Sequence, residues 1–250
     1  MRAMILAAGL GTRLRPLTDD RPKALVEIAG RTLLEITLKR LRSFGINEVI
    51  VNVHHFAEMV EEYLKAHDNF GMEIEISREE DLLDTGGGLK KAAPFFLRKR
   101  ENKGDEPFIL HNVDVLSSID LEEMVEVHRA GDSVATLAVQ QRESLRQLLF
   151  DEQGRLCGRQ TEGEESSEIV RSSEQRQALA FCGVHVVSPR IFDLMHEEGA
   201  FPIIAAYLRM AGEGESILGW RADRFYWRDL GTTASLKLAT EDLERKVVEQ

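Results

Sequence analysis

Cysteine is scarce in this chain, which holds only Cys157 and Cys182 among its 250 residues. Two cysteines form neither a zinc-ligand cluster nor a disulfide framework, so we expect two reduced thiols in a cytoplasmic protein. Long apolar runs are also missing, and none approaches the roughly 20 residues of a membrane-spanning helix. The first predicted strand starts close to Met1, which leaves no room for a signal peptide. We therefore expect neither a secreted scaffold nor a membrane partner.

Positive charge is in deficit as well. The chain has 32 Lys and Arg residues against 43 Asp and Glu residues, a formal net charge of −11. Nucleic acids and membrane surfaces are polyanions, so nonspecific binding to either is not expected. The basic residues near the N-terminus are therefore a local feature on an acidic background, which suits a small anionic ligand. A hydrophobic content of 43% is enough for a sizeable core.

Strand and helix patterns alternate through the first half of the chain. The patterns predict strands at 4–8, 48–53, 73–77 and 107–113, and helices at 32–44, 57–66 and 88–97. This order predicts a Rossmann-like three-layer α/β/α fold with a mostly parallel central sheet. For the second half we predict strands at 134–140, 181–187, 216–220 and 225–229, a hairpin over 147–156, and helices at 121–129, 189–195, 202–210 and 233–248. Residues 162–176 are polar and predict an exposed turn or mobile loop. We expect small antiparallel insertions within one continuous domain over residues 1–250.

The segment Gly9-Leu10-Gly11-Thr12-Arg13 follows the first predicted strand directly. Small residues let a backbone approach a phosphate closely, and the N–H groups of such a turn can point inward as anion donors. Arg13, Arg15 and Lys23 add fixed cations that neutralise phosphate oxygens. A tight strand-to-helix turn explains the glycines alone, but not Thr12 and the cations beside them. The segment predicts a polyphosphate site, most simply for a nucleoside triphosphate.

Two familiar glycine motifs do not fit this loop. The dinucleotide-binding fingerprint needs a third glycine where this chain has Leu14. The Walker-type loop needs Gly-Lys-Ser/Thr, and no such tripeptide follows Gly9 or Gly11. The predicted phosphate loop is therefore of another kind.

Further polar residues lie where predicted strands end. Asp114 follows the strand at 107–113, and Asp229 ends the strand at 225–229. Ligands of an open parallel sheet bind beyond the carboxyl ends of its strands, where two carboxylates suit Mg²⁺. Taken alone, each aspartate is more often a turn cap. Thr85-Gly86-Gly87-Gly88 either opens a helix with Thr85 as its N-cap or brings backbone close to a base or ribose; the entropic cost of three glycines favours the ligand.

Two other features carry no predicted chemistry. His54 and His55 resemble a metal pair, but no third ligand is evident, so we interpret them as loop surface. Cys182 lies within an apolar strand with no obvious base, so core packing is favoured over a nucleophile.

Taken together, these positions resemble the sugar-1-phosphate nucleotidylyltransferases over nearly the whole chain. The matching segments are Gly9-Leu10-Gly11-Thr12-Arg13 with Pro22-Lys23, Asp84-Thr85-Gly86-Gly87-Gly88, Asn112-Val113-Asp114, Phe181-Cys182-Gly183-Val184-His185 and Trp227-Arg228-Asp229-Leu230-Gly231-Thr232. Within that family the chain is most similar to short bacterial uridylyltransferases acting on N-acetylmuramic acid 1-phosphate, and then to mannose-1-phosphate guanylyltransferases. The resemblance implies a nucleotide-binding half over 1–115, a sugar-binding half over 116–250, and no C-terminal β-helix domain.

The resemblance also implies a reaction, in which a nucleoside triphosphate and a sugar 1-phosphate give a nucleotide-sugar and pyrophosphate. The sugar phosphate attacks the α-phosphorus in line. Arg13, Lys23 and Asp114 are the implied catalytic residues, and Asp114 and Asp229 the implied Mg²⁺ ligands. The implied nucleotide-binding residues are Leu6, Ala8, Gly9, Gly11, Thr12, Arg13, Glu79, Thr85, Gly86 and Asn112. The implied sugar-binding residues are Gly183 and Asp114.

Several alternatives stay open at this point. The acceptor can be another phosphorylated alcohol, as in a phosphocholine-type cytidylyltransferase, or the chain can be a non-catalytic regulatory subunit that binds nucleotide-sugars. Because all four implied catalytic and metal residues are present, catalysis is favoured. UTP is the favoured triphosphate, with GTP or CTP as alternatives, and we expect a monomer or small homo-oligomer. Val113 replaces the family's glycine and narrows the space near the sugar, and the acidic stretch 162–168 has no counterpart in the family.

Overall fold

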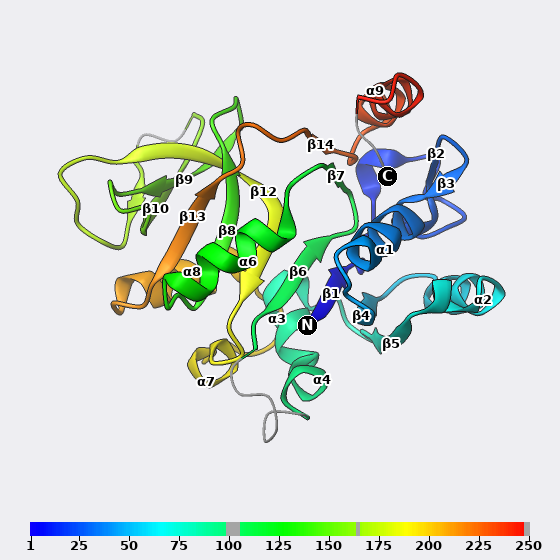
Figure 1. The fold of residues 1–250 in the computed structure, drawn as a ribbon, viewed down its shortest axis with the longest axis horizontal. Coiled ribbons are helices and arrows are strands. Elements are labelled where there is room, and N and C mark those ends of the chain that lie inside the picture. Colours follow the sequence, from blue (N-terminus) through cyan, green and yellow to red (C-terminus); the bar gives the residue numbers. More distant parts are fainter. Residues whose placement is uncertain (99–105, 164–165, 248–250) are drawn as a thin grey trace.

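The computed structural model describes residues 1–98, 106–163 and 166–247. Within these residues a ten-stranded sheet forms the centre of the molecule (Figure 1). Its first part is parallel and runs in the order β5 (Glu73–Arg78), β4 (Glu48–Val53), β1 (Arg2–Leu6) and β6 (Phe108–Asn112). β1, β4 and β6 are rich in β-branched and apolar residues because helices cover both faces of the sheet there, whereas the edge strand β5 alternates Glu and Ile and is partly exposed. Their carboxyl ends therefore meet at one edge of the sheet.

The second half of the chain extends the same sheet. The long strand β12 (Gln177–Val187) pairs antiparallel with β6, and also with β8 (Ala135–Gln140), which in turn pairs parallel with β13 (Ile217–Arg221). The first residues of β12 pair with β9 (Arg146–Phe150), and β10 (Leu156–Thr161) and β11 (Glu168–Ile169) complete that end. Gly154 adopts φ +74° in the predicted hairpin between β9 and β10. The antiparallel insertions are thus built around β12.

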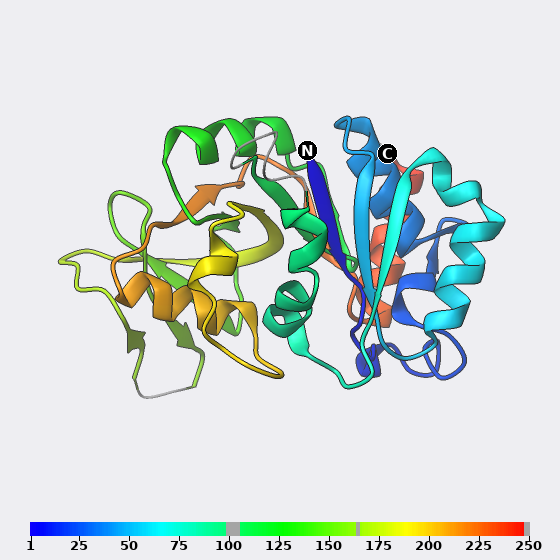
Figure 2. The same cartoon turned by 90° about the horizontal axis from the view of Figure 1, so that it is seen from below.

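Helices cover the sheet on both faces. One face carries α1 (Leu33–Ser43), α2 (Ala57–Ala66), α6 (Leu121–Ala130) and α9 (Thr233–Glu244), whose apolar residues share one core cluster. The other carries α3 (Asp84–Lys91), α4 (Ala93–Leu97), α7 (Ile191–Leu194) and α8 (Ile203–Gly212), which share a second cluster. Figure 2 shows α3 and α4 on one side of the N-terminal strands and α1 and α9 on the other. The predicted three-layer fold is confirmed. No helix in the described ranges is long and apolar enough to cross a membrane.

Two small sheets bring the C-terminal segment back to the N-terminal half. The strand β7 (Val115–Ser117) pairs antiparallel with β14 (Trp227–Asp229), and β2 (Glu27–Ile28) pairs with β3 (Arg31–Thr32). Helix α9 packs against β14 and β2. This return places Asp229 beside the end of β6. The division into halves at residue 115 stays a prediction.

Most predicted elements are present, with boundaries shifted by a few residues. The strand at 4–8 starts and ends two residues earlier, and β2, β3 and β7 were not predicted. The final helix ends at Glu244, and residue 248 lies outside the described residues. The predicted loop over 162–176 contains the short strand β11, and its residues 164–165 also lie outside the described ranges.

The prediction of a helix over 88–97 was wrong at its start and in its continuity. Helix α3 begins at Asp84, contains all three glycines and ends at Lys91, and α4 follows with Pro94 in its first turn. Proline lacks the N–H that a continuous helix requires, so the break falls just before it. Thr85 is not an N-cap: its hydroxyl accepts a hydrogen bond from the Ile203 N–H at 2.9 Å.

Candidate active site

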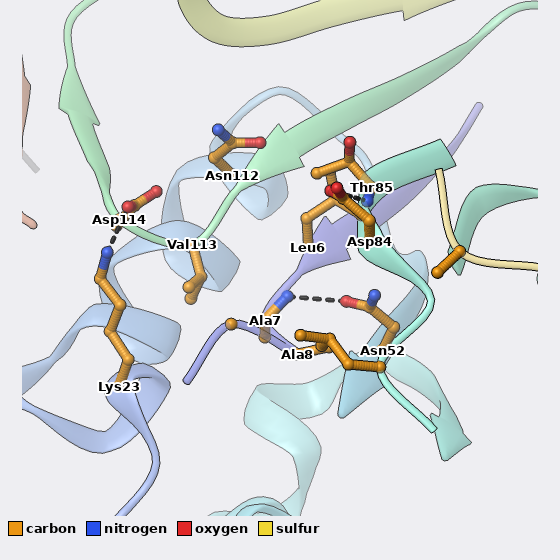
Figure 3. A pocket seen from close by; sticks show the side chains of 13 residues that line it. Leu6, Ala7, Ala8, Lys23, Asn52, Asp84, Thr85, Asn112, Val113 and Asp114 are labelled. Atoms are coloured by element: carbon orange, nitrogen blue, oxygen red, sulfur yellow. Dashed lines mark hydrogen bonds and ion pairs between the residues drawn. The ribbon is translucent and has the colours of Figure 1, made fainter. Parts of the chain in front are cut away.

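A cavity of about 500 Å³ lies beyond the carboxyl ends of β1, β4 and β6. Its lining comes from the first 114 residues, with Ala200 added from the second half. The lining residues are Leu6, Ala7, Ala8, Gly9, Lys23, Asn52, Leu82, Asp84, Thr85, Asn112, Val113, Asp114 and Ala200. Figure 3 shows Lys23 and Asp114 at one side of the cavity and Asp84 and Thr85 at the other. The cavity lies where the sheet topology predicts a ligand site.

The glycine-rich loop borders this cavity with an unencumbered backbone. A Cβ atom added to Gly9 would have no heavy atom within 4 Å. Among the residues that the structure describes, none accepts a hydrogen bond from the N–H groups of Ala8, Gly9, Leu10 or Gly11. Successive free amides of this kind form a concavity that binds anions.

Gly11 has a different reason to be glycine. It adopts φ +63° as it enters the 3₁₀ turn η1 (Thr12–Leu14), a region that favours glycine. A Cβ atom there would lie 2.9 Å from Thr18 Cγ2 and 3.1 Å from Lys23 Cβ. The Thr18 hydroxyl donates a hydrogen bond to the Gly11 carbonyl at 2.9 Å. Gly11 therefore allows the loop to fold back over the segment that carries Lys23.

The cations of the loop segment have different partners. Lys23 lies in the 3₁₀ turn η2 (Lys23–Leu25), is 8% exposed, and its Nζ forms an ion pair with Asp114 Oδ2 inside the cavity. Arg15 instead pairs with Asp19 at 3.3 Å on the surface. The structure thus brings Lys23 and Asp114 together at the predicted site and turns Arg15 away from it.

Arg13 and Asp229 meet at Gly231. A Cβ atom on Gly231 would lie 2.5 Å from Arg13 Nη2 and 2.7 Å from Asp229 Oδ1. The Gly231 N–H donates to Asp229 Oδ1 at 3.0 Å, and the Leu230 N–H donates to the Asp114 carbonyl at 2.8 Å. In the small sheet Asp229 lies opposite Val115, the residue after Asp114. Two aspartates 115 positions apart therefore come close together: Asp114 in the turn before β7, and Asp229 at the end of the neighbouring strand β14.

The remaining predicted residues line the cavity, lie directly behind its lining, or lie on the exposed surface beside it. Leu6, Ala8, Thr85 and Asn112 line the cavity. Gly183 supports it, because a Cβ atom there would lie 2.8 Å from Val115 and 2.9 Å from Asn112 Nδ2. Thr12 is exposed at the start of η1, whereas Glu79 and Gly86 are buried behind the wall.

The glycines of α3 face protein atoms. A Cβ atom on Gly86 would lie 2.3 Å from the Phe201 ring, and one on Gly87 would lie 2.4 Å from the Gly199 carbonyl oxygen. The Gly86 N–H donates to the Phe201 carbonyl at 2.9 Å. These glycines therefore allow α3 to pack closely against the segment that precedes α8. The predicted contact of Gly86 with a nucleotide stays a prediction.

Sequence reasoning did not single out three wall residues, namely Ala7, Asn52 and Ala200. Asn52 had a visible signal: it is the one amide in the β-branched run Glu-Val-Ile-Val-Asn-Val, and a polar side chain in a buried strand needs partners. Asp84 adopts φ +58°, an uncommon conformation for a non-glycine residue that a sequence does not reveal.

The features without predicted chemistry stay outside the site. Cys157 and Cys182 are both free and buried, and burial raises the pKa of the Cys182 thiol to about 12. A thiol that stays protonated is no nucleophile. His54 Nδ1 lies 2.9 Å from the Glu79 carbonyl oxygen, and no metal-type cluster of three His, Cys, Asp or Glu residues occurs in the described part of the chain.

Free amides, a buried lysine and Asp114 beyond the carboxyl ends of a parallel α/β sheet, with Asp229 beside them, are typical of proteins that bind phosphate groups. The chain belongs to the nucleotidyl transferase family, whose model matches residues 2–147. It is 36% identical over 220 residues to the N-acetylmuramate alpha-1-phosphate uridylyltransferase of Caulobacter vibrioides, covering 85% of each protein. It is also 30% identical over 242 residues to the mannose-1-phosphate guanylyltransferase catalytic subunit beta of Xenopus tropicalis, covering 92% of this chain and 61% of that protein.

The fold has close counterparts among solved structures. UDP-glucose pyrophosphorylase complexed with UDP-glucose superimposes with a TM-score of 0.75 at 18% identity, covering 98% of each chain. At that identity the similarity concerns the fold, and it agrees with the mostly parallel α/β architecture described above.

Proposed function

We propose that this chain transfers the nucleotidyl group of UTP to a sugar 1-phosphate and releases pyrophosphate. The observation that carries the proposal is one cavity edge that combines the free amides of residues 8–11 with the Lys23–Asp114 pair and, beside it, Asp229. The uridylyltransferase of Caulobacter vibrioides supports UTP, and its name supports N-acetylmuramate 1-phosphate as the acceptor. GTP is the second candidate, supported by the guanylyltransferase relative.

The positively charged and N–H groups of the site bind different phosphate groups. The free amides of the glycine-rich loop and the exposed guanidinium of Arg13 bind the phosphates that leave as pyrophosphate. Lys23 lies beside the same loop, close to Gly11, and its ammonium group aligns the attacking sugar phosphate with the α-phosphate. That sugar phosphate is largely a dianion near neutral pH, so the attack needs no general base. Catalysis is then mainly alignment and charge neutralisation.

Asp114 and Asp229 fit a magnesium ion. Mg²⁺ takes oxygen ligands and is usually held by one or two carboxylates, with waters and substrate phosphates completing its shell. Asp114 precedes Val115, the register partner of Asp229, so both side chains offer carboxylate oxygens at the edge of the cavity. When bound, Mg²⁺ supplies a Lewis acid that neutralises charge on the α-phosphate.

A pyrophosphate-release screen tests the proposal. Four nucleoside triphosphates are crossed with N-acetylmuramate, mannose and glucose 1-phosphates and with phosphocholine, in Mg²⁺ and in EDTA. We expect the fastest release with UTP and N-acetylmuramate 1-phosphate, and none in EDTA. Release only with CTP and phosphocholine would instead support the cytidylyltransferase alternative. Tight nucleotide-sugar binding without any release would identify a regulatory subunit.

Gly231→Ala is expected to lower kcat/KM about 10- to 100-fold with little change in stability. The nearest atoms that the added Cβ would displace are the ends of two flexible side chains, Arg13 and Asp229. The matched control is Gly212→Ala, whose Cβ would meet Val170 only at 3.4 Å or more. Steady-state kinetics and thermal unfolding of both variants check this prediction. Equal activities of the two variants would contradict a role for the spacing at Gly231.

A further inference from the structure

A series of hydrogen bonds with fixed donor directions runs along the side of the cavity that Asn52, Asp84 and Thr85 line. The Ala7 N–H donates to Asn52 Oδ1 at 2.7 Å, a contact visible in Figure 3. Asn52 Nδ2 donates to Glu79 Oε1 at 2.7 Å, and the Leu83 N–H donates to Glu79 Oε2 at 2.9 Å. Asn52 is 2% exposed and Glu79 is 4% exposed. This series of hydrogen bonds therefore joins the ends of β1, β4 and β5 to Leu83, the residue that precedes α3.

The donor and acceptor of every hydrogen bond in this series are set by the backbone groups at its two ends. The Ala7 and Leu83 N–H groups are backbone donors that cannot be reversed, so the pair between them must accept at both ends. Asn52 can accept from Ala7 only with its oxygen, which turns its NH₂ group toward Glu79. Glu79 therefore accepts on both oxygens, from Asn52 on Oε1 and from Leu83 on Oε2, which a side-chain amide with a single oxygen cannot do.

Helix α3 rests directly on this pair. A Cβ atom on Gly88 would lie 2.7 Å from Glu79 Oε1 and 2.8 Å from Asn52 Nδ2. The backbone of Glu79 is held as well, because its N–H donates to the Val53 carbonyl at 2.8 Å. The pair therefore sets how far the entry of α3, with Asp84 and Thr85, lies from the phosphate loop that begins at Ala7.

We propose that Asn52 and Glu79 are positioning residues that set the separation of the two walls between which the nucleotide binds. This inference rests on the proposed function, because it assumes a triphosphate between Gly9 and Thr85. Glu79 acts through the backbone of Ala7 and Leu83 and not by contact with the nucleotide. Figure 3 shows Asn52 on the other side of the cavity from Lys23 and Asp114, so the pair governs nucleotide binding more than sugar binding.

Exchanging the two functional groups tests this proposal. Glu79→Gln places an NH₂ group against one of the two donors from which Glu79 now accepts. Asn52→Asp turns a carboxylate toward the carboxylate of Glu79. Each single variant therefore interrupts the series of hydrogen bonds. The double variant Asn52→Asp/Glu79→Gln rebuilds it: the carboxylate introduced at position 52 accepts from Ala7 and from the new amide, whose oxygen accepts from Leu83. The exposed neighbour Glu80→Gln is the charge-matched control.

We expect each single variant to raise the KM for the triphosphate about tenfold or more, with the KM for the sugar 1-phosphate unchanged. The double variant should return to within about threefold of the wild type, and thermal stability should follow the same order. If a single variant fails to fold, recovery of folding in the double variant supports the proposal. A double variant as impaired as Glu79→Gln would overturn it, as would single variants that behave like Glu80→Gln.

The thermal measurements separate this proposal from the proposed function. If the wild type releases no pyrophosphate with any substrate pair, the proposed function fails. The role of Asn52 and Glu79 is then judged by thermal stability alone. A double variant that is more stable than either single variant supports the directed series of hydrogen bonds. A double variant that is not more stable overturns it.

Discussion

Asp114→Asn is expected to reduce pyrophosphate release at least about 1000-fold at saturating triphosphate, sugar 1-phosphate and Mg²⁺. The substitution keeps the size of the side chain and removes its charge. Asp114 faces the buried ammonium group of Lys23 and lies one residue before Val115, the register partner of Asp229. The variant therefore loses both the counter-ion of Lys23 and one of the two carboxylates proposed to bind Mg²⁺. Pyrophosphate release measured over a Mg²⁺ titration checks this result.

The controls separate loss of chemistry from loss of fold. Glu126→Gln removes the same unit of charge from an exposed position on α6 and should retain full activity. Asp114→Asn leaves Lys23 buried without its partner, which by itself destabilises a protein. The double variant Lys23→Met/Asp114→Asn removes both charges, so it should recover thermal stability while remaining inactive. Turnover near the wild-type level in Asp114→Asn would remove both the metal role and the proposed mechanism.

A second large effect is expected in acid: the free energy of unfolding should fall steeply as the pH drops from about 6.5 to about 4. Burial lowers the pKa of His111 and of His128 to about 4, and that of His185 to about 3. His111 lies in β6 and His185 beside it in β12, where neighbouring positive charge would add to the cost of protonation. All three side chains are therefore neutral in the folded protein at neutral pH.

Proton binding explains why the free energy of unfolding falls, and does not rise, in acid. In the unfolded chain these histidines titrate near their ordinary pKa of 6.5, so below that pH the unfolded state binds protons that the folded state refuses. Stability is thus complete above pH 6.5 and is lost as the pH falls toward 4. The pKa shifts of His111 and His128 correspond to about 3 kcal/mol each and that of His185 to about 5 kcal/mol, and together they approach the whole stability of a typical domain.

Urea unfolding at closely spaced pH values measures this loss. His128 Nδ1 lies within 3.1 Å of both Ser133 Oγ and Thr136 Oγ1, so His128→Gln keeps a polar side chain in a polar environment. That variant should lose about one proton from the slope of stability against pH below pH 6.5, whatever its stability at neutral pH. The exposed His55→Gln is the matched control. An unchanged slope in His128→Gln would contradict the assignment of the acid sensitivity to buried histidines.

Local patterns in the sequence were enough to place much of the fold. The strand at 48–53 and the helix at 57–66 match β4 and α2 residue for residue, because β-branched runs and apolar residues at helical spacing depend only on close neighbours. The glycine-rich loop, Lys23 and Asp114 were also predicted, and they do meet at one cavity.

The sequence by itself determined the alternation of strands and helices, the glycine-rich loop and the aspartates near strand ends, since each depends on residues adjacent in the chain. Only the tertiary structure decided what those residues face. The three glycines of α3 make room for Phe201, Gly199 and the Asn52–Glu79 pair, and Gly231 makes room for Arg13 beside Asp229. Such contacts join positions from 9 to more than 200 residues apart, and they depend on the order of strands in the sheet, which no local periodicity encodes.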